Sequence, residues 1–209
     1  RGVAISRGGT RENAANLAPD FIAHMEGRYA GTRLGRQELD GEILDDIPGA
    51  LWTLENIAEN RRSAAPADLR RVCVAVDPPV TSGENADECG IVCAGATGND
   101  VSDHAFVLED ASSQGETPDQ WAKRAVRLYH KHKADRIVAE VNNGGELIAD
   151  VIRHQDPNVP VTMVRATRGK VVRCEPVAAL YEQNRVHHVG EAHAFSKLED
   201  QMRQITTDF

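Results

Sequence analysis

The sequence predicts an α/β protein with a mixed sheet: three antiparallel strands followed by parallel strands, flanked by helices, with a short helical segment at the N-terminus. Two observations predict this class. Apolar runs of strand length alternate with helical patterns from residue 72 onward, and the first three runs follow one another with no helix between them. Strands joined by a short turn pair antiparallel, whereas strands joined through a helix lie parallel.

The first three predicted strands are apolar and are separated by turn residues. Residues 72–77 (VCVAVD) form a continuous apolar run that ends in an acid before Pro78 and Pro79. This pattern is typical of a buried strand whose last side chain lies at the sheet edge. Residues 90–97 and 104–112 flank the turn-rich sequence GNDVSD, which predicts an antiparallel hairpin.

Helices and strands alternate through the rest of the chain. Residues 118–133 place Trp121, Ala125, Leu128 and Tyr129 at helical spacing. The elements expected after that helix are, in order, a strand at 136–141, a helix in GELIADVIRHQ at 145–155, a strand at 159–166, a helix at 176–185, a strand at 186–190 and a helix at 196–205.

The N-terminal part has a different composition. Residues 10–28 predict a capped helix, and residues 29–56 are rich in glycine and acids, which predicts a connector without a long element. Residues 57–71 are polar and basic and contain the Ala- and Pro-rich sequence SAAPA. We therefore expect a domain boundary there, with one part at 1–65 and a principal domain at 66–209.

Composition limits the possible classes of protein. The chain has 209 residues, 41% of them hydrophobic, so it is long enough for one good core. No run of about 18 apolar residues occurs, and the first residue is Arg1, so we expect a piece of a longer soluble protein. The four cysteines lie mostly in apolar runs, which indicates reduced, buried thiols. A net charge of -8 argues against a surface that grips a polyanion over its whole face.

Two acids mark the candidate site. Asp77 ends the first strand and Glu140 lies near the end of the fourth, and the expected strand order makes these two strands neighbours. Carboxylates that converge in this way suit hard cations such as Mg²⁺ and Mn²⁺. The alternative is structural: Asp77 caps a strand, and Glu140 pairs with a nearby base such as Arg165.

Basic and turn residues near these strand ends are candidate phosphate contacts. The sequence TRGK with Arg165 and Arg173 follows a parallel strand, where α/β proteins gather their sites, although a solvated loop would look the same. Asn142 lies in the turn directly after Glu140, where it is also typical of a helix cap. The candidates are Arg168, Lys170, Arg173 and Asn142.

Three histidines invite a functional interpretation and a plainer one. His104 stands before a strand and is more typical of a polar strand start than of a site residue. His187 and His188 are adjacent in a short strand, so one should face outward and one inward, and a core histidine with satisfied hydrogen bonds is the favoured interpretation.

The chain as a whole resembles the large subunit of a tailed-bacteriophage DNA-packaging terminase, or the related gene-transfer-agent protein. The resemblance covers nearly the whole chain in the family's order and is most specific in EVNNGG and ALYEQNRVHHVG. The matching segments are SRGGTRENAANLAPDF, YAGTRLGRQELDGEILDDIPGALW, VAVDPP with GENADECGIV, DHAFVLED, RIVAEVNNGG, RCEPVAALYEQNRVHHVG and KLEDQM.

The resemblance implies a two-part motor, in which an ATPase moves DNA and a ribonuclease-H-like nuclease cuts the concatemer. Residues 1–65 would be the end of the ATPase domain with its linker, and 66–209 the nuclease. The implied partners are double-stranded DNA, the portal protein, the small terminase subunit and the ATPase domain of the same full-length chain, in the host cell cytoplasm and away from any membrane. No GxxxxGK[ST] phosphate loop is present, so no ATPase activity is expected of this piece.

Carried over residue by residue, the family's metal ligands fall on acids already singled out. Asp77 matches the first ligand and Glu140 the second, and they would hold two Mg²⁺ or Mn²⁺ ions. Asp87 matches a nearby acid of the same cluster, with Glu88 as the competing choice. The family's third aspartate follows a sequence like TTDF, and this chain ends at Phe209, so the ligand set is expected to be incomplete. The late acids Asp200 and Asp208 are weak substitutes.

Two other functions compete with the nuclease. A docking module would attach the motor to the portal without cutting DNA. A resolvase- or transposase-like protein would share Asp77 and Glu140 but would lack EVNNGG followed by ALYEQNRVHHVG.

Overall fold

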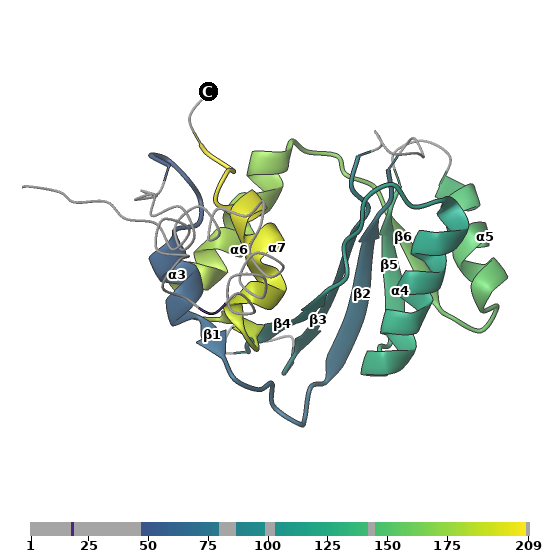
Figure 1. The fold of residues 1–209 in the computed structure, drawn as a ribbon, viewed down its shortest axis with the longest axis horizontal. Coiled ribbons are helices and arrows are strands. Elements are labelled where there is room, and N and C mark those ends of the chain that lie inside the picture. Colours follow the sequence, from purple (N-terminus) through teal and green to yellow (C-terminus); the bar gives the residue numbers. More distant parts are fainter. Residues whose placement is uncertain (1–17, 19–46, 80–86, 99–102, 142–144, 208–209) are drawn as a thin grey trace, which may run out of the picture. The chain divides into compact units, whose positions relative to one another are not determined.

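A computed structural model describes residues 18, 47–79, 87–98, 103–141 and 145–207 (Figure 1). These residues belong to two compact units. One unit spans 55–190, and the other joins residues up to 54 with residues 191–209. The larger unit contains the whole sheet and is described first.

Seven strands form one mixed sheet in the order β1-β7-β4-β3-β2-β5-β6. The hairpin pairs β2–β3 and β3–β4 are antiparallel, whereas β2–β5, β5–β6, β4–β7 and β1–β7 are parallel. This arrangement confirms the predicted mixed sheet. The bounds are β1 (Arg61–Arg62), β2 (Arg71–Asp77), β3 (Gly90–Ala96), β4 (Ala105–Asp110), β5 (Arg136–Glu140), β6 (Val161–Val164) and β7 (Val186–Val189).

Helices α4 and α5 cover one face of the sheet at β2, β3, β5 and β6 (Figure 1). Their bounds are Pro118–His132 for α4 and Gly145–Gln155 for α5. The larger unit also contains α6 (Lys170–Glu182) and all but the first residue of α3 (Leu54–Glu59). None of the helices in the described ranges is long and apolar enough to cross a membrane.

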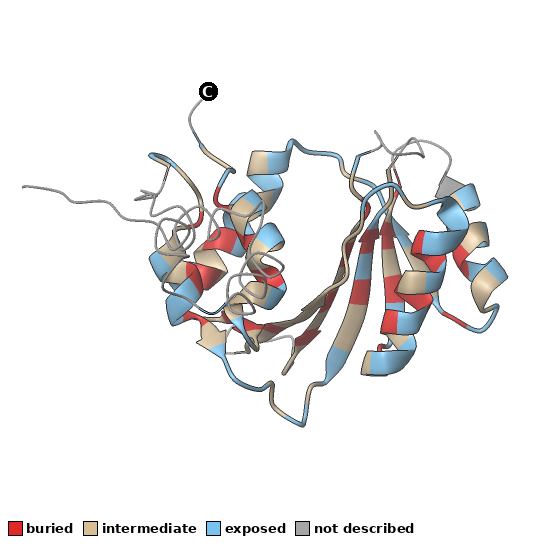
Figure 2. Cartoon of the chain, viewed as in Figure 1, coloured by how far each residue is buried: buried red, intermediate tan, exposed pale blue. Residues whose placement is uncertain are grey.

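The core lies between the sheet and these two helices. Val74, Val76, Ile137 and Ala139 alternate along β2 and β5 with less buried residues and are at most 2% exposed (Figure 2). They pack in one cluster with Trp121 and other residues of α4. Side chains alternate across a strand. Asp77 directly follows Val76 and Glu140 directly follows Ala139, so both acids point to the other face.

Local signals fix the ends of α4. Thr117 accepts a hydrogen bond from the backbone N–H of Gln120, whose side chain bonds back to the N–H of Thr117, and Pro118 fills the first helical position. Lys133 ends the helix in the left-handed region, with φ 50°. This capping explains why the predicted helix agrees with α4 to within one residue.

Helices α3 and α6 and strand β1 differ from the prediction, and α3 was not expected at all. Helix α6 begins at Lys170 and not at 176, because Pro176 lies inside the helix and not at its start. A proline removes one helical hydrogen bond but does not forbid a helix from continuing past it. The two-residue strand β1 was not predicted, since it consists of Arg61 and Arg62 and is defined only by backbone pairing with β7.

The smaller unit contributes its described residues 47–54 and 191–207. A 3₁₀ turn, η2 (Ala192–Phe195), leads into α7 (Ser196–Met202), within the helix predicted at 196–205. The backbone N–H of Leu51 donates to the carbonyl of Ile205, which joins the two segments of this unit. The helix predicted at 10–28 lies almost wholly outside the described residues. The boundary expected between residues 65 and 66 stays a prediction.

Glu116 gives the first test, because it anchors the start of α4. Its carboxylate accepts hydrogen bonds from Arg124 and from the Ser113 hydroxyl, and the Arg124 bonds hold the pKa of Glu116 below its usual value. We expect Glu116→Gln to lower the free energy of unfolding by about 1 kcal/mol at neutral pH. The pKa is depressed in the folded state, so this stabilisation is present above about pH 4.3 and is lost as the pH falls through the folded pKa.

Urea denaturation at pH 7 and at pH 3 measures the difference. Glu182→Gln, an exposed acid at the end of α6, is the matched control and should leave stability unchanged at both pH values. A loss in Glu116→Gln that is equally large at pH 3 would contradict the ion-pair explanation.

Candidate metal centre

Asp77 and Glu140 lie side by side at the ends of neighbouring strands. Strands β2 and β5 run parallel, and their register pairs Val76 with Ala139 at the last ladder position before the two acids. Since Val76 and Ala139 are buried under the helices, both carboxylates project from the opposite face of the sheet. The structure therefore brings together the two acids that the sequence selected.

The charge of Glu140 acts on Asp77. Burial raises the pKa of Asp77 above its usual value, and the negative charge of Glu140 raises it further. The positive charges of Arg173 and Lys170 oppose this rise. Repulsion between two like charges destabilises the folded state, and such pairs are typical of sites that bind a cation.

Helix α6 supplies the positive charges. Arg173, in its first turn, donates from Nη1 to Oε2 of Glu140 at 2.9 Å. Lys170 begins the helix, three residues earlier, so the two side chains lie on the same side of α6. The alternative that Glu140 pairs with a nearby base is thus correct in kind, but the base is Arg173 and not Arg165. That pairing across 33 residues has no local sequence signal, apart from the i, i+3 spacing of Lys170 and Arg173.

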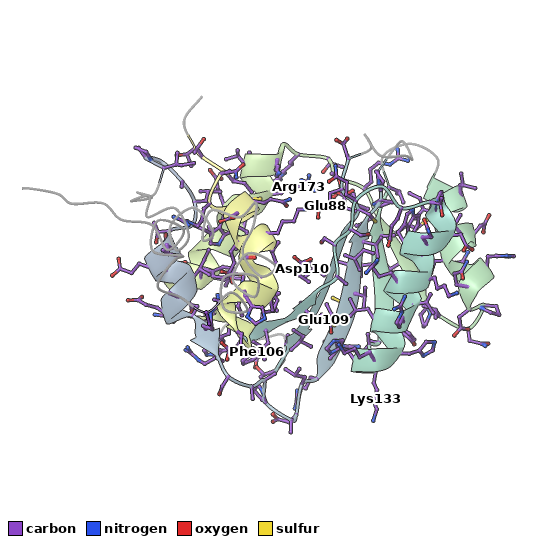
Figure 3. All side chains as sticks on the ribbon, viewed as in Figure 1. Glu88, Phe106, Glu109, Asp110, Lys133 and Arg173 are labelled. Atoms are coloured by element: carbon purple, nitrogen blue, oxygen red, sulfur yellow. The ribbon has the colours of Figure 1, made fainter. Side chains whose placement is uncertain are left out.

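The remaining candidates lie around this pair to different degrees. Arg168 is exposed in the loop that leads to α6, and Asp87 is exposed just before β3. Glu88 is half-buried, and its charge, together with those of Glu116 and Asp77, adds to the burial that raises the pKa of Cys89 to about 12. Figure 3 shows Arg173 and Glu88 at the same end of the molecule, opposite Lys133.

The residues present fit a hard divalent cation in part. Two carboxylates with mutual repulsion offer oxygen ligands, and a cation between them would remove that repulsion. Within the described ranges, no group of three histidine, cysteine or acidic side chains is placed to hold one ion. Asn142 and Asp208 lie outside those ranges, and Asp200 belongs to α7 in the other unit.

The three histidines lie elsewhere and have structural roles. The expectation that one of His187 and His188 faces outward is wrong, because both are buried, at 2% and 0% exposure. Side chains cover both faces of β7: His188 packs against Tyr181 of α6, and His187 packs against His104 and Phe106. His188 Nε2 lies 2.6 Å from the hydroxyl of Tyr181, and His187 Nε2 lies 2.7 Å from Nδ1 of His104.

His104 is remote from the two acids. It precedes β4, which runs parallel to β2 because both are antiparallel to β3. The start of β4 is therefore at the sheet end where β2 begins, opposite Asp77. Burial, followed by the charge of Arg62, lowers the pKa of its partner His187, which favours the neutral form of His187.

The order and directions of the strands are those of an α/β domain of the ribonuclease-H-like class. A family model described as the terminase RNaseH-like domain matches residues 74–208. The chain belongs to this family, which confirms the resemblance to the large terminase subunit. None of the curated proteins compared with it matches.

Solved structures share the fold. The nuclease domain of the large terminase subunit gp2 of bacterial virus Sf6 aligns with a TM-score of 0.57 at 15% identity, covering 77% of this chain and 84% of that one. The large terminase nuclease from thermophilic phage G20c with bound magnesium aligns at 0.50 and 14% identity, covering 77% and 82%. A variant of the Sf6 nuclease domain with manganese aligns at 0.55 and 13% identity, covering 77% and 84%.

The repulsion at the acid pair gives a second test. Asp77→Asn removes one of two repelling charges, so we expect it to raise the melting temperature of the metal-free protein. The pKa of Asp77 is raised in the folded state, so the benefit of the substitution should appear as the pH rises through that pKa and vanish in acid. Mn²⁺ should raise the melting temperature of the wild type but not of the variant.

Thermal denaturation followed by circular dichroism, with and without Mn²⁺, measures both effects. Asp150→Asn is the control, because this aspartate is 71% exposed on α5 and does not contact the acid pair. If Mn²⁺ stabilised Asp77→Asn as much as the wild type, the ion would bind elsewhere.

Proposed function

We propose that this chain is a metal-dependent endonuclease that cleaves concatemeric double-stranded DNA during viral genome packaging. The observation that carries the proposal is the pair Asp77 and Glu140, side by side at two strand ends in a member of the terminase ribonuclease-H-like family. The related folds are nucleases by name, and their structures include magnesium and manganese complexes.

Asp77 and Glu140 would hold two Mg²⁺ or Mn²⁺ ions, with Asp87 as a nearby acid of the same cluster. Such ions supply a nucleophilic water near neutral pH and neutralise charge on the phosphate oxygens as the phosphodiester bond breaks. Glu88 competes with Asp87, because it is more buried and lies near Cys89, whose pKa also responds to Asp77.

Basic residues beside the acids would hold the DNA backbone. Lys170 and Arg173 project from the first turn of α6, and Arg168 lies in the exposed loop before it. Guanidinium and ammonium groups bind phosphate oxygens strongly, and Asn142 would add an amide donor after Glu140. These contacts position DNA without reading its sequence.

The rest of the packaging machinery follows from the same family. We propose that the ATPase domain of the full-length chain moves the DNA, while the portal protein and the small terminase subunit guide it to the nuclease in the host cytoplasm. The net charge of -8 supports a need for partners. A chain in which acids outnumber bases binds DNA only locally and gains from proteins that present the DNA to it.

Plasmid cleavage in Mg²⁺ or Mn²⁺ tests the proposal. Asp77→Ala and Glu140→Ala should each lower the cleavage rate by on the order of a hundredfold or more, since each removes charge stabilisation at the reacting phosphate. Asp150→Ala, on the far helix layer, should cut at the wild-type rate. Asp87→Ala and Glu88→Ala are compared in the same assay. The variant that loses activity identifies which of these two acids belongs to the cluster.

Cleavage that survives both Asp77→Ala and Glu140→Ala would overturn the nuclease assignment of this site. Absence of cleavage even in a longer version that carries the family's third aspartate, with the metal-dependent stabilisation intact, would favour the docking module.

A further inference from the structure

Glu140 already has a cation as its partner. Arg173 Nη1 lies 2.9 Å from Oε2 of Glu140, and the Glu140 side chain is 20% exposed while that of Arg173 is 42% exposed. The pair therefore stands at the surface of the candidate centre, where solutes reach it. The oxygen that Arg173 occupies is one of those that a divalent ion at Glu140 would use.

We propose that Arg173 competes with divalent ions for Glu140 and releases it when a DNA phosphate draws the guanidinium away. The inference rests on the proposed function for the nature of the two ligands. It goes beyond that function by assigning Arg173 a regulatory exchange between the acid and the substrate.

The geometry permits this exchange. An arginine has five N–H donors in a planar fork, and the interaction with Glu140 uses one nitrogen of the three. Among the described residues, the Arg173 side chain donates to Glu140 alone, so no second hydrogen bond holds the guanidinium in place. A phosphate offers more acceptor oxygens than one carboxylate and pairs with guanidinium in a bidentate manner.

The position of Arg173 on α6 directs the exchange toward DNA. Lys170 lies one turn earlier on the same side, and the N-cap residue Gly169 provides no side-chain cap for the helix. Both features make the first turn of α6 attractive to an anion. A phosphate that approaches Lys170 therefore comes within reach of Arg173 as well.

The consequence is a coupling between two ligands. If phosphate binding frees Glu140, then phosphate raises the affinity for the metal, and the metal raises the affinity for phosphate by the same factor. The metal centre then assembles fully when DNA is in place and stays incomplete without it.

Calorimetric titration with Mn²⁺ tests the competition without relying on cleavage. Arg173→Gln removes the charge and keeps a polar side chain of intermediate length, so we expect Mn²⁺ to bind about tenfold more tightly, equivalent to about 1.4 kcal/mol. Arg153→Gln is the matched control, since Arg153 is exposed on α5, which covers the other face of the sheet, and should leave the affinity unchanged. Circular dichroism checks that all three proteins are folded.

A second titration tests the release step. Ca²⁺ is titrated with and without a short DNA duplex, which should tighten Ca²⁺ binding in the wild type and do so less in Arg173→Gln. Unchanged or weaker Mn²⁺ binding in Arg173→Gln would overturn the competition, as would the absence of Mn²⁺ binding in every variant. An equal effect of the duplex in both proteins would overturn the release.

These outcomes are separate from those of the proposed function. No cleavage even in the longer version that carries the family's third aspartate, with tighter Mn²⁺ binding in Arg173→Gln, would reject the nuclease and keep the competition. Cleavage that depends on Asp77 and Glu140, with unchanged Mn²⁺ binding in Arg173→Gln, would do the reverse.

Discussion

The parallel pairing of β2 with β5 is the constraint on which the rest of the structure depends. Its register pairs Val76 with Ala139, so the core side chains of both strands face α4 and α5 together. The same register then fixes the two terminal acids on the opposite face, next to each other. A shift of one residue in either strand would bury a carboxylate in the core, so folding of the hydrophobic layer and placement of Asp77 and Glu140 are a single event.

The acid pair has a cost, and helix α6 offsets part of it. Burial and the charge of Glu140 both disfavour the charged form of Asp77, while Arg173 and Lys170 favour it. Without a cation in the site, the first turn of α6 is the nearest source of positive charge. The fold therefore keeps two repelling carboxylates in place by means of residues that also suit phosphate, which is how a binding site is kept intact before its ligands arrive.

The sequence predicted best where local and long-range signals agree. The helix expected at 145–155 has the bounds of α5, and the strand expected at 72–77 differs from β2 by one residue. The start of α6 was missed because Pro176 was taken as the first residue of the helix, whereas the helix continues through it. The Arg173–Glu140 bond could not be predicted, since it joins residues brought together only by the packing of α6 against the finished sheet. The same holds for His187 and His188, whose burial depends on side chains from distant parts of the chain, such as Phe106 and Tyr181.

The charge distribution argues that restraint is built into the centre itself. A chain with a net charge of -8 repels DNA at long range, so the few cations on α6 and its preceding loop act only on a phosphate delivered to them. Arg173 and Lys170 offset part of the charge of the acids when no phosphate is present. The cations pair with the acids when no substrate is present and with phosphate when DNA is bound. The centre therefore has low affinity for metal alone and for DNA alone, and higher affinity for each when the other is bound.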